Sequence, residues 1–189
     1  MNLIKLTFVS LFVLASLQQG FTQKISVAGQ FGYAAPTGNL FEDAEGESTT
    51  SFGIFYNLDA LYHFDSKMAA GLTLEGNVLF TSDGDLGVYG LSLYGVKGYY
   101  RFFESAVSPY ATLSLGLSQF STPDVTVGGS TIDGENAYSF GIRPEIGVEL
   151  GGFIIAASYF VPMEYEFDNF KGKGGALQFS IGYRHFLEF

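Results

Sequence analysis

The sequence predicts an all-β fold, an eight-stranded antiparallel up-and-down transmembrane β-barrel. Three observations lead to this prediction: apolar and polar residues alternate along most segments, the expected connections alternate between short and long, and the composition favours strands. Among 189 residues there are 25 Gly, 20 Phe and 12 Tyr, while only 15% of residues are charged. Such a composition is typical of many short strands joined by tight turns.

Charge and cysteine content narrow the functional classes. The formal net charge of −10 argues against a nucleic-acid partner, because nucleic-acid binding requires a basic surface. The chain has no Cys, so a disulfide framework and a Cys-based metal site are both excluded. No phosphate-binding glycine loop, zinc spacing or catalytic triad is visible, and we expect neither a cofactor nor a metal.

Residues 1–23 are predicted to be a secretory signal peptide, and residues 24–189 the barrel domain. Lys5 precedes an apolar run over 6–17, which is too short to cross a bilayer core that needs roughly 20 apolar residues. Cleavage is expected near Thr22 or Gln23; the alternative is a buried N-terminal helix. Because no later apolar run is long enough to span, a membrane location requires a closed barrel.

The alternation predicts eight strands and two kinds of connection. The short connections are 65–67, 104–108 and 151–152, and the others are mostly longer, at 35–50, 82–87, 122–135 and 164–175. Bacterial barrels have an even strand number, short periplasmic turns and longer extracellular loops, which would place both termini in the periplasm. The expected strands are 24–34, 51–64, 68–81, 88–103, 109–121, 137–150, 152–163 and 176–189.

Side-chain facing is clearest in 137–150, where even positions are apolar and odd positions include Arg143, Glu145 and Glu149. A basic side chain facing lipid at the midplane costs about 2–4 kcal/mol, so we expect the charged face to line the lumen. Aromatic residues near the strand ends are expected to form two girdles. The girdle residues are Tyr33, Phe52, Phe80 and Tyr138 at the outer side, and Tyr62, Phe64, Tyr100, Phe102 and Phe189 at the inner side.

The segment 88–103 departs from this pattern. If Lys97 faces the lumen, the same parity turns Leu91 and Leu93 inward. One extra residue in a strand reverses the facing beyond it, so we predict a β-bulge near Tyr94–Gly95.

The last expected strand ends on an aromatic residue after a regular alternation. Tyr183, Leu187 and Phe189 lie on its apolar face, and this pattern resembles the C-terminal strand of Gram-negative outer-membrane β-barrels. The resemblance implies that these three residues form the signal read by the barrel assembly machinery. Over the whole mature chain, the pattern is similar to the small barrels of the OmpX, OmpW and OmpA-transmembrane type. It implies a monomeric protein of the cell outer membrane, in contact with outer-membrane lipid and lipopolysaccharide.

A soluble lipocalin-like barrel, with the apolar faces turned inward around a ligand, is the alternative fold. Its exterior would then carry many glycines and few charges, and the terminal Phe189 would have no explanation.

The interior of an eight-stranded barrel is just wide enough for side chains to fill. We therefore expect a structural network in the lumen, and the alternative is a narrow OmpW-like, porin-like channel for small or hydrophobic molecules. The expected network consists of Asp59, His63, Glu75, Lys97, Arg101, Arg143, Glu145, Glu149, Arg184 and Glu188.

We predict that the protein is not an enzyme and that its role is structural or an adhesion-like surface interaction through acidic extracellular loops. His63 and His185 are the only histidines, and both fall near the periplasmic strand ends with no nucleophile indicated beside them. The acidic loop residues are solvated tips or, as the alternative, ligands for Ca²⁺ or Mg²⁺. They are Glu42, Asp43, Glu45, Glu47, Asp83, Asp85, Asp124, Asp133, Glu135, Glu164, Glu166 and Asp168.

Overall fold

The computed structural model describes residues 24–41, 50–81, 88–123, 125–127, 130–132, 134–167 and 170–188. The predicted signal peptide, Phe189 and most of the acidic loop residues lie outside this part of the chain. No helix among the described residues is long and apolar enough to cross a membrane.

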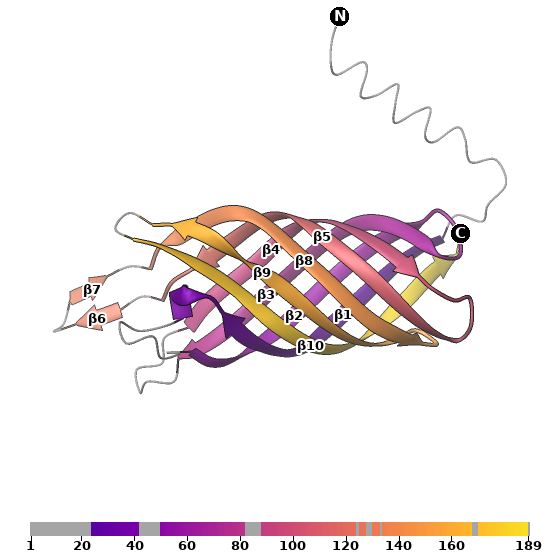
Figure 1. Cartoon of the computed structure of the whole chain (residues 1–189), viewed down its shortest axis with the longest axis horizontal. Helices are drawn as coiled ribbons and strands as arrows, with labels where there is room; N and C mark the ends of the chain where they lie inside the picture. The colour runs from indigo at the N-terminus through magenta and orange to yellow at the C-terminus, as the bar shows by residue number, and fades with distance from the viewer. Residues whose placement is uncertain are drawn as a thin grey trace, which may run out of the picture.

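Eight strands form a closed antiparallel barrel, which confirms the predicted fold class (Figure 1). Each long strand pairs with the next along the chain, and the first strand closes the barrel by pairing with the last. The order around the wall is β1-β10-β9-β8-β5-β4-β3-β2. The strands are β1 (Lys24–Thr37), β2 (Thr50–His63), β3 (Met68–Thr81), β4 (Val88–Arg101), β5 (Val107–Ser121), β8 (Asn136–Leu150), β9 (Phe153–Glu166) and β10 (Lys171–Glu188).

The two ends of the barrel differ, and we call them the turn end and the loop end. The turn end holds the three short connections and the paired strand ends Lys24 and Glu188. The loop end carries the 3-10 element η1 (Asn39–Phe41) and a small hairpin of β6 (Val125–Val127) and β7 (Ser130–Ile132). This hairpin stands beyond the barrel wall (Figure 1) and was not predicted.

The β8–β9 connection shows why a glycine pair forms a turn here. Gly151 and Gly152 have φ of 57° and 101°, backbone values that residues with a side chain rarely adopt. Two positive φ values in a two-residue hairpin are typical of the type I′ turn, whose twist matches the adjoining strands. Gly151 N–H also donates to Ala106 C=O at 2.9 Å. This hydrogen bond joins the β8–β9 turn to the neighbouring β4–β5 turn.

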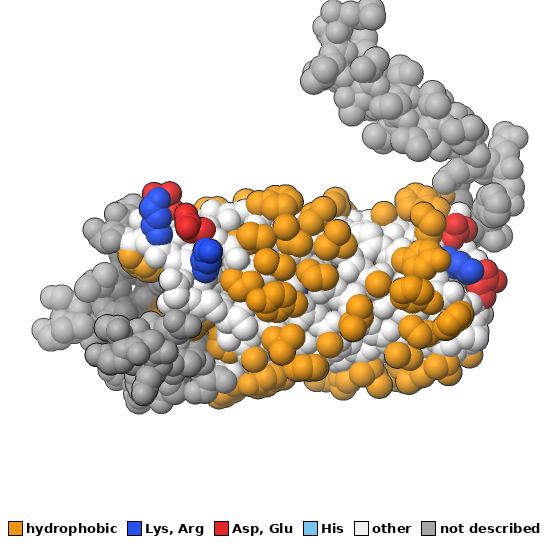
Figure 2. All heavy atoms as spheres, in the orientation of Figure 1, with side chains coloured by type: hydrophobic (Ala, Val, Ile, Leu, Met, Phe, Trp, Pro, Cys, Tyr) orange, Lys and Arg blue, Asp and Glu red, His pale blue; other side chains and the backbone are white. Residues whose placement is uncertain are grey.

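The apolar faces of the strands point outward. Leu72, Ile146 and Phe153 are 68%, 67% and 65% exposed, whereas Glu75 and Arg143 are buried. On the face shown in Figure 2, apolar side chains cover the middle of the barrel, and charged side chains appear only near its two ends. The soluble alternative, with apolar faces inward, is therefore wrong.

The bulge predicted near Tyr94–Gly95 is also wrong. The β4 register with both neighbouring strands is continuous through these residues, so Leu91 and Leu93 do face inward and are fully buried. Both side chains fit inside because the lumen at this level of the barrel is filled by other apolar side chains, such as Phe55 and Phe160. The prediction failed because it assumed a polar interior along the whole barrel.

The β8–β9 ladder is short compared with the rest of the wall. It runs over six residue pairs, from Glu145↔Ser158 to Leu150↔Phe153, whereas the β5–β8 ladder runs over fifteen. Toward the loop end, β9 pairs with β10 through a register shift between Gly174 and Ala176. The regular β8–β9 register thus ends at Glu145↔Ser158, well before the loop end of the two strands.

Candidate functional site

The barrel interior is the candidate site, and Arg143 is the centre of its charged layer. This β8 side chain is fully buried, and its Nη2 lies 2.6 Å from Glu145 Oε2 and 2.9 Å from Ser158 Oγ. Its Nε donates to Gln178 Oε1 at 2.7 Å and lies 3.1 Å from Glu75 Oε2. One guanidinium therefore connects β3, β8, β9 and β10 across the lumen.

A second ion pair lies beside Arg143. Lys97 Nζ on β4 is 2.6 Å from Asp59 Oδ2 on β2, and Thr73 donates to Asp59 Oδ1 at 2.7 Å. The two bases of this layer thus face three buried carboxylates. Both oxygens of Glu75 lack an aligned hydrogen bond, although one is within ion-pair distance of Arg143, so Glu75 is the least satisfied of the three.

A lower layer closes the lumen near the turn end. Arg184 Nε lies 3.4 Å from Glu149 Oε2, and its guanidinium carbon is 4.5 Å from the centre of the Tyr99 ring, a cation–π geometry. Tyr99 in turn donates to Glu149 Oε2 at 2.8 Å. Ser26 Oγ links Arg184 Nη1, at 3.1 Å, to His63 Nε2, at 2.8 Å.

Two tyrosines join the layers. Tyr110 donates to Glu145 Oε1 at 2.9 Å, and its ring stacks on Tyr99 with centroids 5.4 Å apart. The two layers are therefore joined through stacked rings, each of which hydrogen-bonds to a carboxylate of one layer.

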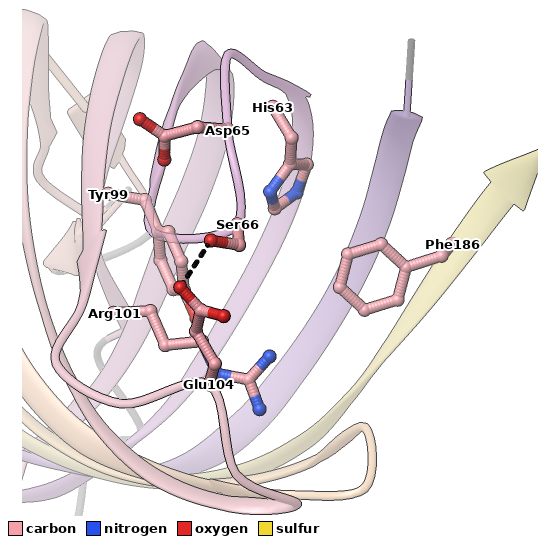
Figure 3. A pocket seen from close by; sticks show the side chains of 7 residues that line it. All are labelled: His63, Asp65, Ser66, Tyr99, Arg101, Glu104 and Phe186. Carbon is pink, nitrogen blue, oxygen red and sulfur yellow. Dashed lines mark hydrogen bonds between the residues drawn. The ribbon is translucent and has the colours of Figure 1, made fainter. Parts of the chain in front are cut away.

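Below the lower layer is an open pocket of about 380 Å³ at the turn end (Figure 3). Arg101, expected in the lumen network, lies here instead, and its Nη2 donates to Ser105 C=O at 2.7 Å. Ser66 donates to Glu104 at 2.8 Å across the pocket. The side chain of Glu188 lies outside the described residues. The remaining network residues are in the two layers, with His63 between the lower layer and this pocket.

Asp65 shapes the β2–β3 turn at the rim of the pocket. Its Oδ1 accepts the backbone N–H groups of Lys67 and Met68, both at 2.7 Å. These two hydrogen bonds lower the pKa of the Asp65 carboxyl from its ordinary value, because they stabilise the charged form.

The loop end of the lumen is filled by aromatic rings, which we call the aromatic cap: Phe41, Tyr89, Phe120, Tyr165 and Phe167. Phe120 is its centre, with ring centroids 5.3–5.9 Å from the other four. Below the cap the apolar filling continues with Phe55, Leu79, Leu91, Leu93 and Phe160.

The alternation pattern does not predict the aromatic cap, because two of its residues, Phe41 and Phe167, lie in connections rather than in strands. Phe41 comes from η1, which is anchored where Asn39 Oδ1 accepts the Lys173 backbone N–H at 2.6 Å. The signal in the sequence is the apolar pair Leu40–Phe41 ahead of the acidic run at 42–47.

In the part of the chain that the structure describes, no three His, Asp or Glu side chains are grouped to hold a metal ion. Most of the acidic loop residues fall outside that part, so the cation-binding alternative stays a prediction.

No protein-family model and no curated protein match this sequence, but solved structures share its fold. Neisserial surface protein A is 17% identical, with a TM-score of 0.58, covering 89% of this chain and 98% of its own. Ail, the attachment invasion locus protein of Yersinia pestis, solved with the heparin analogue sucrose octasulfate, is 17% identical with a TM-score of 0.57, covering 87% and 100%. The outer membrane protein OprG of Pseudomonas aeruginosa is 12% identical with a TM-score of 0.52, covering 87% and 96%. The chain thus has the fold of small eight-stranded outer-membrane barrels, as predicted.

Proposed function

We propose that the chain is a closed, non-enzymatic outer-membrane barrel that acts through its loop end in structure or surface contact. The observation that carries this proposal is the filled lumen. The Arg143 layer blocks the middle of the barrel, and the aromatic cap centred on Phe120 fills the loop end. A barrel without an open path leaves its outer surface and loops as the parts that meet other molecules.

Single-channel recording in planar bilayers tests this proposal. We expect no discrete openings from the folded protein, because a conducted ion would have to pass both the charged layer and the cap. Reproducible openings would overturn the closed-barrel proposal and favour the narrow channel.

The narrow channel is the second candidate because of the turn-end pocket. It has a volume of about 380 Å³, and Tyr99 of the lower layer is among the residues that line it. Conduction would still require the rings of the cap to separate.

The charge of the chain suggests the class of surface partner. Ail was solved with a heparin analogue, a polyanion, whereas this chain has a net charge of −10 and acidic residues in every long connection. We therefore propose a basic partner or a divalent cation rather than a sulfated polysaccharide. Retention of the folded protein by immobilised polylysine, but not by heparin, would support this assignment; the reverse would overturn it.

We also propose that the barrel is monomeric, contacts outer-membrane lipid and lipopolysaccharide, and is inserted by the barrel assembly machinery. Tyr183 lies on the exposed face of β10 and Leu187 is half-buried, and Phe189 follows. Deleting Phe189 should reduce the amount of folded barrel in the outer membrane of cells without changing the unfolding of the inserted fraction. A normal yield of the deletion variant would remove the assembly role.

A further inference from the structure

The turn-end pocket holds charged and aromatic groups that the proposed function does not use. Its volume of about 380 Å³ lies within the usual range of small-molecule sites, about 300–1,000 Å³. The wall is built from β4, from the ends of β2 and β10, and from the β2–β3 and β4–β5 turns. Elements that are distant in the sequence therefore meet around a space of ligand size.

Arg101 is the cation of this pocket, and the protein does not neutralise it. The half-buried side chain donates from Nη2 to Ser105 C=O at 2.7 Å, and its Nε is buried without a hydrogen-bond partner. It forms no ion pair with any side chain that the structure describes. A guanidinium has five N–H donors and matches the geometry of a carboxylate. Arg101 is thus suited to a carboxylate from a ligand.

The acidic groups of the pocket lie on its two turns. Ser66 donates to Glu104 Oε1 at 2.8 Å, which joins the β2–β3 turn to the β4–β5 turn. Asp65 uses Oδ1 to accept both turn N–H groups, and these hydrogen bonds lower its pKa, so it is ionised at neutral pH. One oxygen of each carboxylate makes no hydrogen bond to a described residue. These two oxygens can accept from an ammonium group.

Aromatic rings form the remaining side of the pocket. The ring centroid of His63 lies 5.1 Å from that of Phe186 and 6.0 Å from that of Tyr99. His63 is held by Ser26 Oγ at 2.8 Å, and the Tyr99 hydroxyl by Glu149 at 2.8 Å. In Figure 3 the Phe186 ring points into the opening from the side opposite the charged groups. An apolar wall therefore faces a wall that carries both signs of charge.

We propose that the turn-end pocket binds a free α-amino acid with an apolar side chain, as its zwitterion. Arg101 takes the α-carboxylate, Glu104 and Asp65 take the ammonium group, and the apolar side chain packs on Phe186. A simple carboxylate would meet the two acidic residues, and a simple amine would meet Arg101. A ligand with both charges pairs with all three. This inference goes beyond the proposed function, because it concerns the end of the barrel opposite the loops.

Isothermal titration calorimetry tests the charge requirement on the unchanged protein. The folded barrel in dodecyl maltoside micelles is titrated with leucine, with N-acetylleucine, which keeps only the carboxylate, and with leucinamide, which keeps only the amine. We expect leucine to bind and each analogue to bind at least about tenfold more weakly, because each loses one set of charge-assisted hydrogen bonds. No binding of leucine, or an analogue that binds as tightly as leucine, would overturn the proposal.

Two variants show which residue meets which end of the ligand. Arg101→Gln should abolish the preference for leucine over leucinamide, because the carboxylate loses its partner. Glu104→Gln should reduce the preference for leucine over N-acetylleucine, because the ammonium group loses one of its two partners. A change in ligand preference is a readout that a loss of stability alone would not produce.

Glu166→Gln is the matched control, because Glu166 pairs with Lys171 at 2.9 Å on the exposed surface at the loop end. Its affinity for leucine should equal that of the unchanged protein. Pocket variants that fold, as judged by circular dichroism, and keep the original ligand preferences would overturn the assignment, and so would an equal loss in the control.

The outcome is separable from the proposed function. A barrel that is silent in planar bilayers and binds no leucine retains its proposed role and loses only this site. A barrel that binds leucine with the expected preferences but shows discrete openings keeps the site and loses the closed-barrel proposal.

Discussion

The middle and the loop end of the barrel solve the same packing problem by different means. Around Arg143 the lumen is filled by ion pairs and hydrogen bonds with fixed directions. Around Phe120 it is filled by rings that interlock without directional bonds. A narrow barrel therefore requires a lumen that is filled and whose charged groups are all paired, but the filling itself can be polar or apolar. The polarity of the filling decides at which end of the barrel water can enter.

Removing the centre of the charged layer should have the largest effect. Arg143→Ala leaves Glu75 and Glu145 buried without their shared base, and losing one partner of a buried pair costs about 3–5 kcal/mol. Urea unfolding in lipid vesicles measures the loss. Lys171→Ala is the control, because Lys171 pairs with Glu166 at 2.9 Å but is 58% exposed; its unfolding midpoint should stay unchanged. Equal effects of the two variants would contradict the structural role of the layer.

The cap should come next. Phe120→Ala removes the ring that touches the four other cap residues, and a buried Phe→Ala change costs about 3 kcal/mol or somewhat more. Phe140→Ala, on the lipid-facing side, should cost clearly less. The same variant sharpens the comparison in planar bilayers, where Phe120→Ala should remain silent because the Arg143 layer still closes the lumen. Conduction by Phe120→Ala would show that the cap alone seals the barrel.

Neighbouring residues on opposite faces of β8 test the facing itself. Ile146→Arg places a charge in lipid, at a cost of about 2–4 kcal/mol near the midplane. Glu145→Gln keeps the shape of the buried group that accepts from Arg143 and Tyr110, and should cost about 1–3 kcal/mol. The pair is compared by urea unfolding in the same vesicles. A harmless Ile146→Arg beside a disruptive Glu145→Gln would mean that the facing is reversed.

The smallest effect on stability is expected at Asp65 in the β2–β3 turn, which lies outside both the charged layer and the aromatic cap. The folded pKa of Asp65 is lowered, so its contribution to stability is present above the ordinary carboxyl pKa of about 4 and is lost as pH falls through the folded value. Asp65→Asn should therefore lower the urea midpoint at about pH 7 and leave it unchanged under strongly acidic conditions. If the difference in urea midpoint between the unchanged protein and Asp65→Asn grew as the pH fell, this prediction would be contradicted.

Alternation in the sequence predicts what depends on local periodicity and misses what depends on partners. The eight strands follow from a period of two, because lipid outside requires one apolar face on every strand. The pattern predicts a bulge near Tyr94–Gly95 because it has no place for apolar residues such as Leu91 and Leu93 inside the barrel. The lumen around these two leucines is apolar because of Phe41, Phe120 and Phe167, which lie far away in the sequence.

The short β8–β9 ladder is not predicted, for a related reason. Pro144 fits the even, outward positions of its strand and so raises no conflict with alternation. Ladder length is a property of two strands together, and single-strand periodicity carries no information on it.

The closure between β1 and β10 has a kinetic consequence. This ladder pairs Lys24 with Glu188 and continues without a break to Thr37 and Gly175, so it joins the two ends of the barrel sequence. Contacts of such high sequence separation are slow to form, because the loop entropy is lost before the contacts are gained. Until they form, the first and last strands are both open edges, which hydrocarbon does not tolerate. Whatever receives the nascent barrel in the membrane must shield two strand edges at once and release them together.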